Sequence, residues 1–434
     1  MRTRRRVSPV VELLEDRWCP SAAGQVVNGN LVITDSSAAS LVITETGANS
    51  FEVSDGGTAI SGSPFTGVTK NVFVELSGNN ANTVAINLNG NTAPGSINVG
   101  LGSGVSSLTV VNGTITRSLN VMGGSSQDTV TLGDGTNALT VDGNVFVGTG
   151  LIGFPPGMVG STTTTTGATT GGLTVDGDVT VDGVLSANAL SQVTLDAGST
   201  VQRGVSITGS STGTAATLDG TVNGNVVFSG SRGGFGGFFG PPFGMPPVNP
   251  ATNAVTLDGT VSGDLFVVGN GGNTTLTTGS SSSVGQDLVA LLGGGNDTAN
   301  LGGKIGDGLY LTAGSGTDAV NVGGSIANWA EVFLGSGNDN VTVSGSIGSA
   351  GGKTGWMVLE AGSGNDTVTF ASTASINQAA AVVLGGGKDT VNLQGSTTTP
   401  LPVQLIGFGG GTKTINGSQS QLKYTPIGTW TFTG

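Results

Sequence analysis

The sequence predicts an all-β protein, built as a single right-handed parallel β-helix (a solenoid), and three observations support this fold class. Glycine supplies 80 of the 434 residues, but it does not recur at every third position as a collagen triple helix requires. A short aspartate motif recurs at intervals of 20-odd residues. Runs of Val, Thr, Asn and Leu alternate between apolar and polar, with a period of two instead of the 3.6 of a helix.

The aspartate motif defines one strand of each coil. It reads G-x-G-x-D, and apolar residues follow two and four places later, as Val341 and Val343 follow Asp339 with Thr342 between them. Because neighbouring side chains of a strand point to opposite faces, the two valines should face the core and the threonine the solvent. A second apolar pair stands seven and five places before each aspartate. The copies align on Asp297, Asp318, Asp339, Asp366 and Asp389.

Weaker copies extend the repeat toward the N-terminus. Asp128 stands in a related motif, and Asn82, Ser106 and Thr274 occupy the aspartate position in other copies. Strands that return so soon leave no room for a crossover helix, so each coil must stack on the next. We therefore expect about sixteen coils across residues 25–434, with strands about 4.8 Å apart and glycine at the corners.

Two segments interrupt the repeat, at about 150–171 and 230–252. Both contain phenylalanine, methionine, glycine and paired prolines. Proline cannot donate a hydrogen bond to a sheet, so we expect both segments to be loops ejected from the rod. Two alternatives remain open: the loops bind a partner, or they fold back over the rod.

We expect residues 1–24 to be a separate, largely disordered export or sorting tag. Five of the 14 basic residues lie within the first seventeen positions. The run ELLEDRWCPSA, from Glu12 to Ala22, resembles the LEPR-type N-terminal tag of exported and cell-surface proteins of planctomycete bacteria, with Asp16 where the proline of that tag stands. The resemblance implies an extracellular or cell-surface location. The alternative is a disordered basic tail.

Composition excludes many functions. The chain has no histidine and one cysteine, Cys19, so it has no Ser-His-Asp triad, no histidine-bound metal and no internal disulfide. The net charge of −13 disfavours nucleic acid, whose binding depends on Lys and Arg. No apolar run is long enough to span a membrane as a helix.

The aspartate motif also resembles the calcium-binding repeat of RTX secreted proteins, G-G-x-G-x-D-x-U-x. In that family, glycine turns present backbone carbonyls and the aspartate presents a carboxylate to Ca²⁺. The resemblance implies calcium ligands at Asp297, Asp318, Asp339 and Asp366. The first motif position is Leu or Ala here, and Lys413 stands where the next aspartate would be, which disfavours calcium at the C-terminal end. The alternative is that each aspartate caps backbone N–H groups at a glycine corner.

Trp329 and Trp356 both lie ten residues before their aspartates, so they should stack on adjacent coils. An exposed pair would be a candidate ligand contact for a carbohydrate, whereas a buried pair would be packing at a corner.

These observations predict a secreted or cell-surface structural or adhesive protein without catalytic residues. Calcium is the only cofactor implied, and the candidate partners are an extracellular polysaccharide, a cell-surface protein or a second copy of the chain. The alternative is a polysaccharide-binding or polysaccharide-degrading enzyme, a lyase or hydrolase. Such an enzyme needs carboxylates clustered on one strand face beside a basic group, and Arg117, Arg203 and Arg232 are far apart in the repeat.

Overall fold

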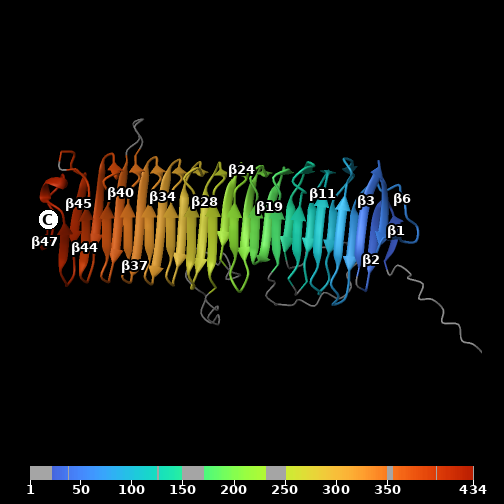
Figure 1. The fold of residues 1–434 in the computed structure, drawn as a ribbon, viewed down its shortest axis with the longest axis horizontal. Coiled ribbons are helices and arrows are strands. Elements are labelled where there is room, and N and C mark those ends of the chain that lie inside the picture. Colours follow the sequence, from blue (N-terminus) through green and yellow to red (C-terminus); the bar gives the residue numbers. More distant parts are fainter. Residues whose placement is uncertain are drawn as a thin grey trace, which may run out of the picture.

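The chain forms a long rod of stacked β-strands (Figure 1). The computed structural model describes residues 22–37, 39–124, 127–148, 171–230, 251–348, 355–396 and 398–433. Within these ranges the only helix is a short 3-10 turn, η1 (Gln419–Gln421), and no described helix could cross a membrane. The prediction of an all-β parallel solenoid is confirmed.

Each full turn contributes one strand to each of three sheets, which we name sheets A, B and C. Sheet A has 16 strands. They are β1 (Ala23–Val27), β2 (Asn30–Asp35), β7 (Val72–Leu76), β10 (Ile97–Gly100), β13 (Leu119–Met122), β16 (Val145–Gly148), β19 (Val184–Leu190), β22 (Gly204–Gly209), β25 (Asn225–Ser229), β28 (Leu265–Asn270), β31 (Leu288–Gly293), β34 (Gly308–Ser315), β37 (Trp329–Ser336), β40 (Trp356–Gly362), β43 (Ala379–Leu384) and β45 (Val403–Gly407).

Sheet B follows sheet A along the chain in each turn. Its strands are β3 (Ser40–Gly47), β4 (Ser50–Asp55), β5 (Thr58–Ala59), β6 (Phe65–Thr66), β8 (Thr83–Asn87), β11 (Ser107–Val111), β14 (Thr129–Leu132), β17 (Gly172–Val175), β20 (Gln192–Leu195), β23 (Ala215–Leu218), β26 (Asn253–Leu257), β29 (Thr274–Thr278), β32 (Thr298–Leu301), β35 (Ala319–Val322), β38 (Asn340–Val343), β41 (Thr367–Phe370), β44 (Asp389–Leu393), β46 (Lys413–Asn416) and β47 (Trp430–Phe432).

Sheet C closes each turn and has 12 short strands. They are β9 (Thr92–Ala93), β12 (Gly113–Ile115), β15 (Leu139–Val141), β18 (Val179–Val181), β21 (Thr200–Val201), β24 (Thr221–Val222), β27 (Thr260–Val261), β30 (Ser283–Val284), β33 (Lys304–Ile305), β36 (Ser325–Ile326), β39 (Ser346–Ile347) and β42 (Ser375–Ile376).

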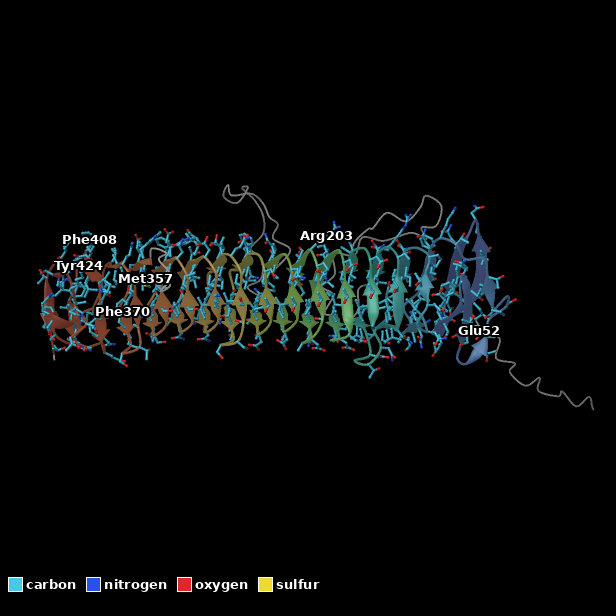
Figure 2. All side chains as sticks on the ribbon, turned by 90° about the horizontal axis from the view of Figure 1, so that it is seen from above. Glu52, Arg203, Met357, Phe370, Phe408 and Tyr424 are labelled. Carbon is cyan, nitrogen blue, oxygen red and sulfur yellow. The ribbon has the colours of Figure 1, made fainter. Side chains whose placement is uncertain are left out.

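Parallel pairing in register turns each sequence position into a column along the rod. On β38, Val341 pairs with Val320 of the coil before and Val368 of the coil after. All three are buried, as the alternating pattern predicts, while Thr342 on the opposite face is partly exposed. Side chains project from both faces of the strands along the rod (Figure 2), and the inward set forms one continuous apolar core.

The expected count of about sixteen coils is too high, since the rod has about 13 turns. The reason lies at the two ends, where the chain does not complete three-strand turns. At the N-terminal end, β1 runs antiparallel to β2, and β4 runs antiparallel to β3, β5 and β6. At the C-terminal end, β45, β46 and β47 belong to sheets A and B only.

The predicted insertions fall largely outside the described residues, which omit 149–170 and 231–250. The chain passes through both gaps at the same kind of corner, between a strand of sheet A and the next strand of sheet B. Of the predicted N-terminal tag, residues 1–21 are also outside the described part, and β1 already begins at Ala23.

The corner from sheet A to sheet B requires glycine for two reasons. Gly316, Gly337, Gly364 and Gly387 have φ of 143°, 151°, 144° and 125°, in a region that other residues rarely adopt. In addition, a Cβ at each would collide with the carbonyl oxygen of the equivalent glycine one coil earlier. The coils can therefore approach to strand-pairing distance only if this position lacks a side chain.

Two adjacent glycines give a matched test of this requirement. We expect Gly387→Ala to lower the free energy of unfolding by roughly 2–5 kcal/mol, since the methyl group is both strained and overpacked. Gly386→Ala should change it by about 0.5 kcal/mol or less, because Gly386 has no positive φ and open space where a Cβ would stand. Urea unfolding followed by circular dichroism measures both variants, and equal losses would refute the argument.

Candidate functional site

The recurring aspartates form a buried column at the corner from sheet A to sheet B. Asp297, Asp318, Asp339 and Asp366 each directly precede a strand of sheet B, and Asp389 begins β44. The strands that follow pair in register, so the five side chains stack on successive coils. Each is only 1–2% exposed, which places the carboxylates inside the rod. We call these five residues the aspartate column.

One carboxylate oxygen of every column member caps the neighbouring coil. Oδ1 of Asp297 accepts the backbone N–H of Thr274 at 2.6 Å. The bond then repeats along the column, from each aspartate N–H to Oδ1 of the next aspartate, at 2.8, 2.9, 3.0 and 3.0 Å. Each aspartate therefore caps a backbone N–H group, which is the alternative to calcium that the sequence left open. The N–H group belongs to the preceding coil. This role leaves the second oxygen of each carboxylate to be explained.

The second oxygen, Oδ2, is buried without a hydrogen-bond partner in the four aspartates for which the sequence predicts calcium, Asp297, Asp318, Asp339 and Asp366. A buried charge without a partner is unfavourable, because it has lost its water. Burial raises the pKa of Asp297 to about 7 and that of Asp366 to about 6, with a smaller contribution from neighbouring aspartates. Burial also raises the pKa of Asp318 and Asp339.

The C-terminal end of the column shows how a cation fits this corner. Lys413 pairs in register with Asp389, and its Nζ lies 2.7 Å from Asp389 Oδ2. The same Nζ donates to the carbonyl oxygens of Gly385 at 2.6 Å and Gly387 at 3.1 Å. Lys413 is 4% exposed, so a buried ammonium neutralises this carboxylate. The prediction that Lys413 occupies the next aspartate position is confirmed.

The same oxygen types recur at the corners of the preceding coils. In the coil of Asp366, Gly362 and Gly364 stand at the same motif positions as Gly385 and Gly387, and their carbonyl oxygens lie directly against those two glycines. In the described residues, no three acidic, cysteine or histidine side chains gather closely enough to hold a metal ion. A metal at this corner would therefore use one carboxylate from each coil together with backbone carbonyls, the oxygen ligands that calcium prefers.

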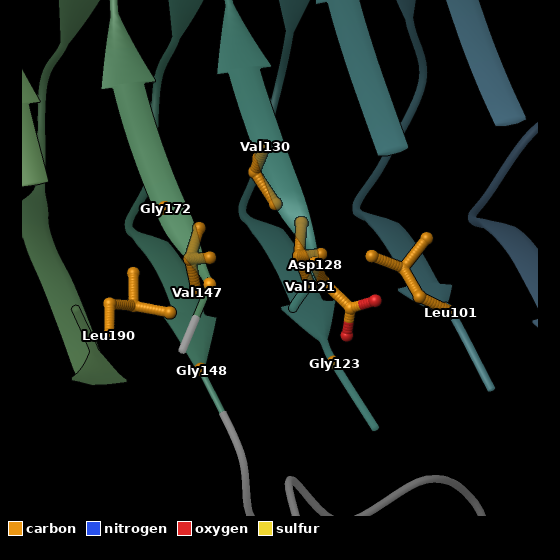
Figure 3. Close-up of a pocket in the computed structure, with 10 residues that line it drawn as sticks. Leu101, Val121, Gly123, Asp128, Val130, Val147, Gly148, Gly172 and Leu190 are labelled. Atoms are coloured by element: carbon orange, nitrogen blue, oxygen red, sulfur yellow. The ribbon is translucent and has the colours of Figure 1, made fainter. Parts of the chain in front are cut away.

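Toward the N-terminus, Gly171 stands at the aspartate position of the coil that follows Asp128, so this corner has no side chain. A cavity of about 10 Å³ remains there, beside Asp128 and lined by Leu101, Val121 and Leu190 (Figure 3). Its volume suits about one water molecule and no larger ligand. Both oxygens of Asp128 are satisfied, by the N–H groups of Ser106 and Gly124 at 2.9 Å each. Burial nevertheless raises the pKa of Asp128 to about 6.

A second acidic column lies at the corner from sheet B to sheet C. Asp176, Asp196, Asp219 and Asp258 each follow a strand of sheet B on successive coils. Burial, and after it repulsion from Asp196 and Asp178, raises the pKa of Asp176. The sequence shows these aspartates as a related repeat unit, an aspartate after a short apolar strand that is followed by glycine in all but Asp196, but the pattern alone assigned them no role. These residues are at least partly exposed, but Oδ1 of Asp219 is buried without a hydrogen-bond partner.

Trp329 and Trp356 stack on adjacent coils, as their spacing predicts. Their ring centroids are 6.0 Å apart and the planes differ by 18°. Both residues are half-buried. The other face of Trp329 lies against Gly308, where a Cβ would collide with the ring. Both faces of Trp329 are thus used in packing along the rod, which favours packing over a carbohydrate platform.

The Lys413 ion pair can be tested directly. We expect Lys413→Met to lower the free energy of unfolding by about 3–5 kcal/mol, because Asp389 is then buried without its partner. Adding Asp389→Asn should recover most of this loss. Lys304→Met, at an exposed lysine of sheet C, is the control and should change stability by about 0.5 kcal/mol or less. Urea unfolding measures all three variants, and a stable Lys413→Met protein would contradict the assignment.

The raised pKa values predict a pH dependence in metal-free buffer. An unfolded aspartate has a pKa of about 3.9, so the folded column binds more protons than the unfolded chain between about pH 4 and 7. Stability should therefore fall as pH rises through this window. Removing one charge with Asp297→Asn should raise the free energy of unfolding by about 1–3 kcal/mol at pH 8 and by little at pH 4.

Asparagine is a fair replacement because the protein already uses it at the equivalent position of earlier coils. Oδ1 of Asn82 accepts the N–H of Ala39 at 3.0 Å, and Oδ1 of Asn253 accepts that of Thr214 at 3.3 Å. Thermal unfolding at pH 4 and pH 8 with a chelator present is the measurement. A loss of stability in Asp297→Asn at pH 8 would show that the carboxylate charge is already compensated.

Comparison with known proteins adds no relative. No family model, curated protein or solved structure matches the chain significantly. What the structure establishes is a β-solenoid repeat protein.

Proposed function

We propose that the chain is a structural or adhesive rod of the extracellular space or cell surface, stabilised by Ca²⁺ bound along the aspartate column. The observation that carries the proposal is the set of four buried Oδ2 atoms without partners. Four carboxylates stacked at about the 4.8 Å spacing of paired strands repel one another unless a cation or a proton neutralises them. At neutral pH and extracellular calcium concentrations, a divalent cation suits this role.

Lys413 supports a cation at these corners. Its Nζ contacts one carboxylate oxygen and two glycine carbonyls in the coil of Asp389. No lysine or arginine stands at the equivalent position in the coils of Asp297 to Asp366, where another aspartate follows in the column. A cation between two of these coils would draw on the same kinds of oxygen, carboxylate Oδ2 atoms and glycine carbonyls. Ca²⁺ takes six to eight oxygen ligands.

The outer faces of the strands support a scaffold over an enzyme. On sheet B, polar uncharged side chains bond from coil to coil, as Asn321 Nδ2 does to Asn300 Oδ1 at 2.7 Å. On sheet A, Glu331 has Tyr310 and Val358 as its strand neighbours, neither of them basic. A groove of about 290 Å³ over the paired strands β3 and β4, bordered by Ala59 and Pro64, is lined by a single ionisable residue, Glu52. Glycoside cleavage needs two carboxyl groups roughly 5–9.5 Å apart.

A calcium titration tests the proposal. We expect millimolar Ca²⁺ to raise the melting temperature of the wild-type chain at pH 8. A free Ca²⁺ concentration one hundred times the Kd adds about 2.7 kcal/mol to the free energy of unfolding. Asp318→Asn with Asp339→Asn should remove most of this rise. In chelator the same variant should be more stable than wild type, because two buried charges are gone. Glu360→Gln is the control, an exposed acid on the same coil as Asp366, and should keep the full rise.

Two outcomes would overturn calcium binding. The first is no rise in the melting temperature of the wild type, and the second is an equal rise in the Asp318→Asn, Asp339→Asn variant. A rise that Mg²⁺ produces as well as Ca²⁺ would point to general screening of the acidic rod, whose net charge is −13.

A further inference from the structure

The antiparallel strands β3, β4, β5 and β6 close the N-terminal end of sheet B (Figure 1), and we call them the N-terminal cap. The inward positions of β3 and β4 are apolar except for two acids, Glu45 and Asp55. Glu45 is 0% exposed, as are Ile43, two residues before it, and Phe51, its partner across the hairpin. Among the described acids, only Glu45 has both carboxylate oxygens buried without a hydrogen-bond partner. Such a group has lost its water and gained no bond in return.

The second acid of the hairpin shows that this fold can satisfy a buried carboxylate. Asp55 lies at the other end of the hairpin, and its Oδ1 accepts the backbone N–H of Ser40 at 2.9 Å. Glu45 is bonded only through its main chain, where its carbonyl oxygen accepts Asn91 Nδ2 at 3.0 Å. The backbone of Glu45 is therefore held in place while its carboxyl group is left in apolar surroundings.

The described coils around Glu45 offer it no positive charge. In residues 22–116 the only lysine or arginine is Lys70, which is exposed and whose side chain lies beside Gly29. On β4, Glu52 is exposed on the outer face, and Asp55 is at the far end. Strands β6 and β8 and the corner at 88–93 have no titratable residue. Burial alone therefore raises the pKa of Glu45 to about 7.

The hairpin is least regular at the end where Glu45 stands. Its pairing shifts register between Glu45 and Gly47, which is a β-bulge, and Asn49 in the turn has a φ of 64°. On its other side, β4 pairs only with β5 and β6, each of two residues. A terminal hairpin with so few partners is the kind of unit that opens locally without unfolding of the rest.

We propose that Glu45 makes the hairpin of β3 and β4 a proton-controlled latch at this end of the rod. While Glu45 is protonated, a neutral carboxyl group stays in the apolar interior and β4 remains against β3. When Glu45 ionises, its charge regains water only if the hairpin opens. Because β4 covers the edge of β3, the latch decides whether the N-terminal edge of sheet B is covered or free to pair with another strand.

The direction of the pH dependence follows from proton binding. The closed hairpin holds the Glu45 proton up to about pH 7, whereas the open hairpin releases it near the ordinary value of 4.5. The closed form therefore binds more protons between these values, and opening becomes more favourable as the pH rises. From pH 5 to pH 8 the opening equilibrium should increase roughly 70-fold.

Hydrogen exchange of the full chain in chelator measures this opening. The reporter amides are those of Gly56, Ile60 and Val68, whose N–H groups bond within the N-terminal cap. Their protection factors, which are corrected for the intrinsic effect of pH on exchange, should fall roughly 70-fold from pH 5 to pH 8. Protection that does not change with pH would overturn the proposal.

Substitution separates Glu45 from the aspartate column, whose own pH dependence is the same in every variant. Glu45→Gln keeps the size of the side chain and is neutral at every pH, so it should remove most of the fall in protection at the three amides. Glu52→Gln, on the outer face of the neighbouring strand, is the matched control and should keep the full fall. An unchanged fall in Glu45→Gln would refute the role of Glu45.

A second variant keeps the test valid if Glu45→Gln does not fold. Glu45→Leu places an apolar side chain in apolar surroundings, and at pH 8 it should raise the protection of the same three amides at least about tenfold above wild type. Protection equal to or below that of the wild type at pH 8 would overturn the latch.

Discussion

The distance between successive coils is the constraint on which the rest of this structure depends. Backbone hydrogen bonds hold parallel strands about 4.8 Å apart, and every corner must come equally close. At the corner from sheet A to sheet B, the carbonyl oxygen of one glycine occupies the space of a Cβ on the next, as with Gly337 and Gly364. The high glycine content is therefore a direct consequence of stacking, and the aspartates are buried because this tight corner holds them against the core.

Stacking in register also multiplies the effect of each sequence position. A single outward valine is unremarkable, but Val289 beside Phe266 and Tyr310 becomes part of a surface. A single buried aspartate would be a capped corner, but Asp339 between Asp318 and Asp366 becomes part of a line of charges. The repeat thus builds the candidate cation site from residues that would carry little meaning alone.

The sequence predicts the interior well because periodicity and burial are local. The motif around Asp339 places Val341 inside and Thr342 outside, and the structure agrees. The ends were mispredicted because antiparallel pairing of β3 with β4 depends on which edge the chain meets, and a repeat count does not contain this. The separate roles of Oδ1 and Oδ2 also lie beyond a motif, since they depend on which N–H of the neighbouring coil each oxygen reaches. The stacking of Trp329 on Trp356 followed from spacing, whereas the Gly308 contact required coordinates.

Three kinds of positive charge can neutralise the aspartate column, and the structure shows one of them. Lys413 supplies an ammonium to Asp389, fixed by the chain and independent of the medium. The remaining carboxylates must take a proton or a metal ion from the surroundings, and the two compete for the same oxygen. Burial raises the pKa of Asp297 to about 7, so protons suffice in mild acid, while above neutrality only a cation relieves the repulsion. The C-terminal coil, with its own lysine, should then be the least sensitive to the medium, and the coils before it the most.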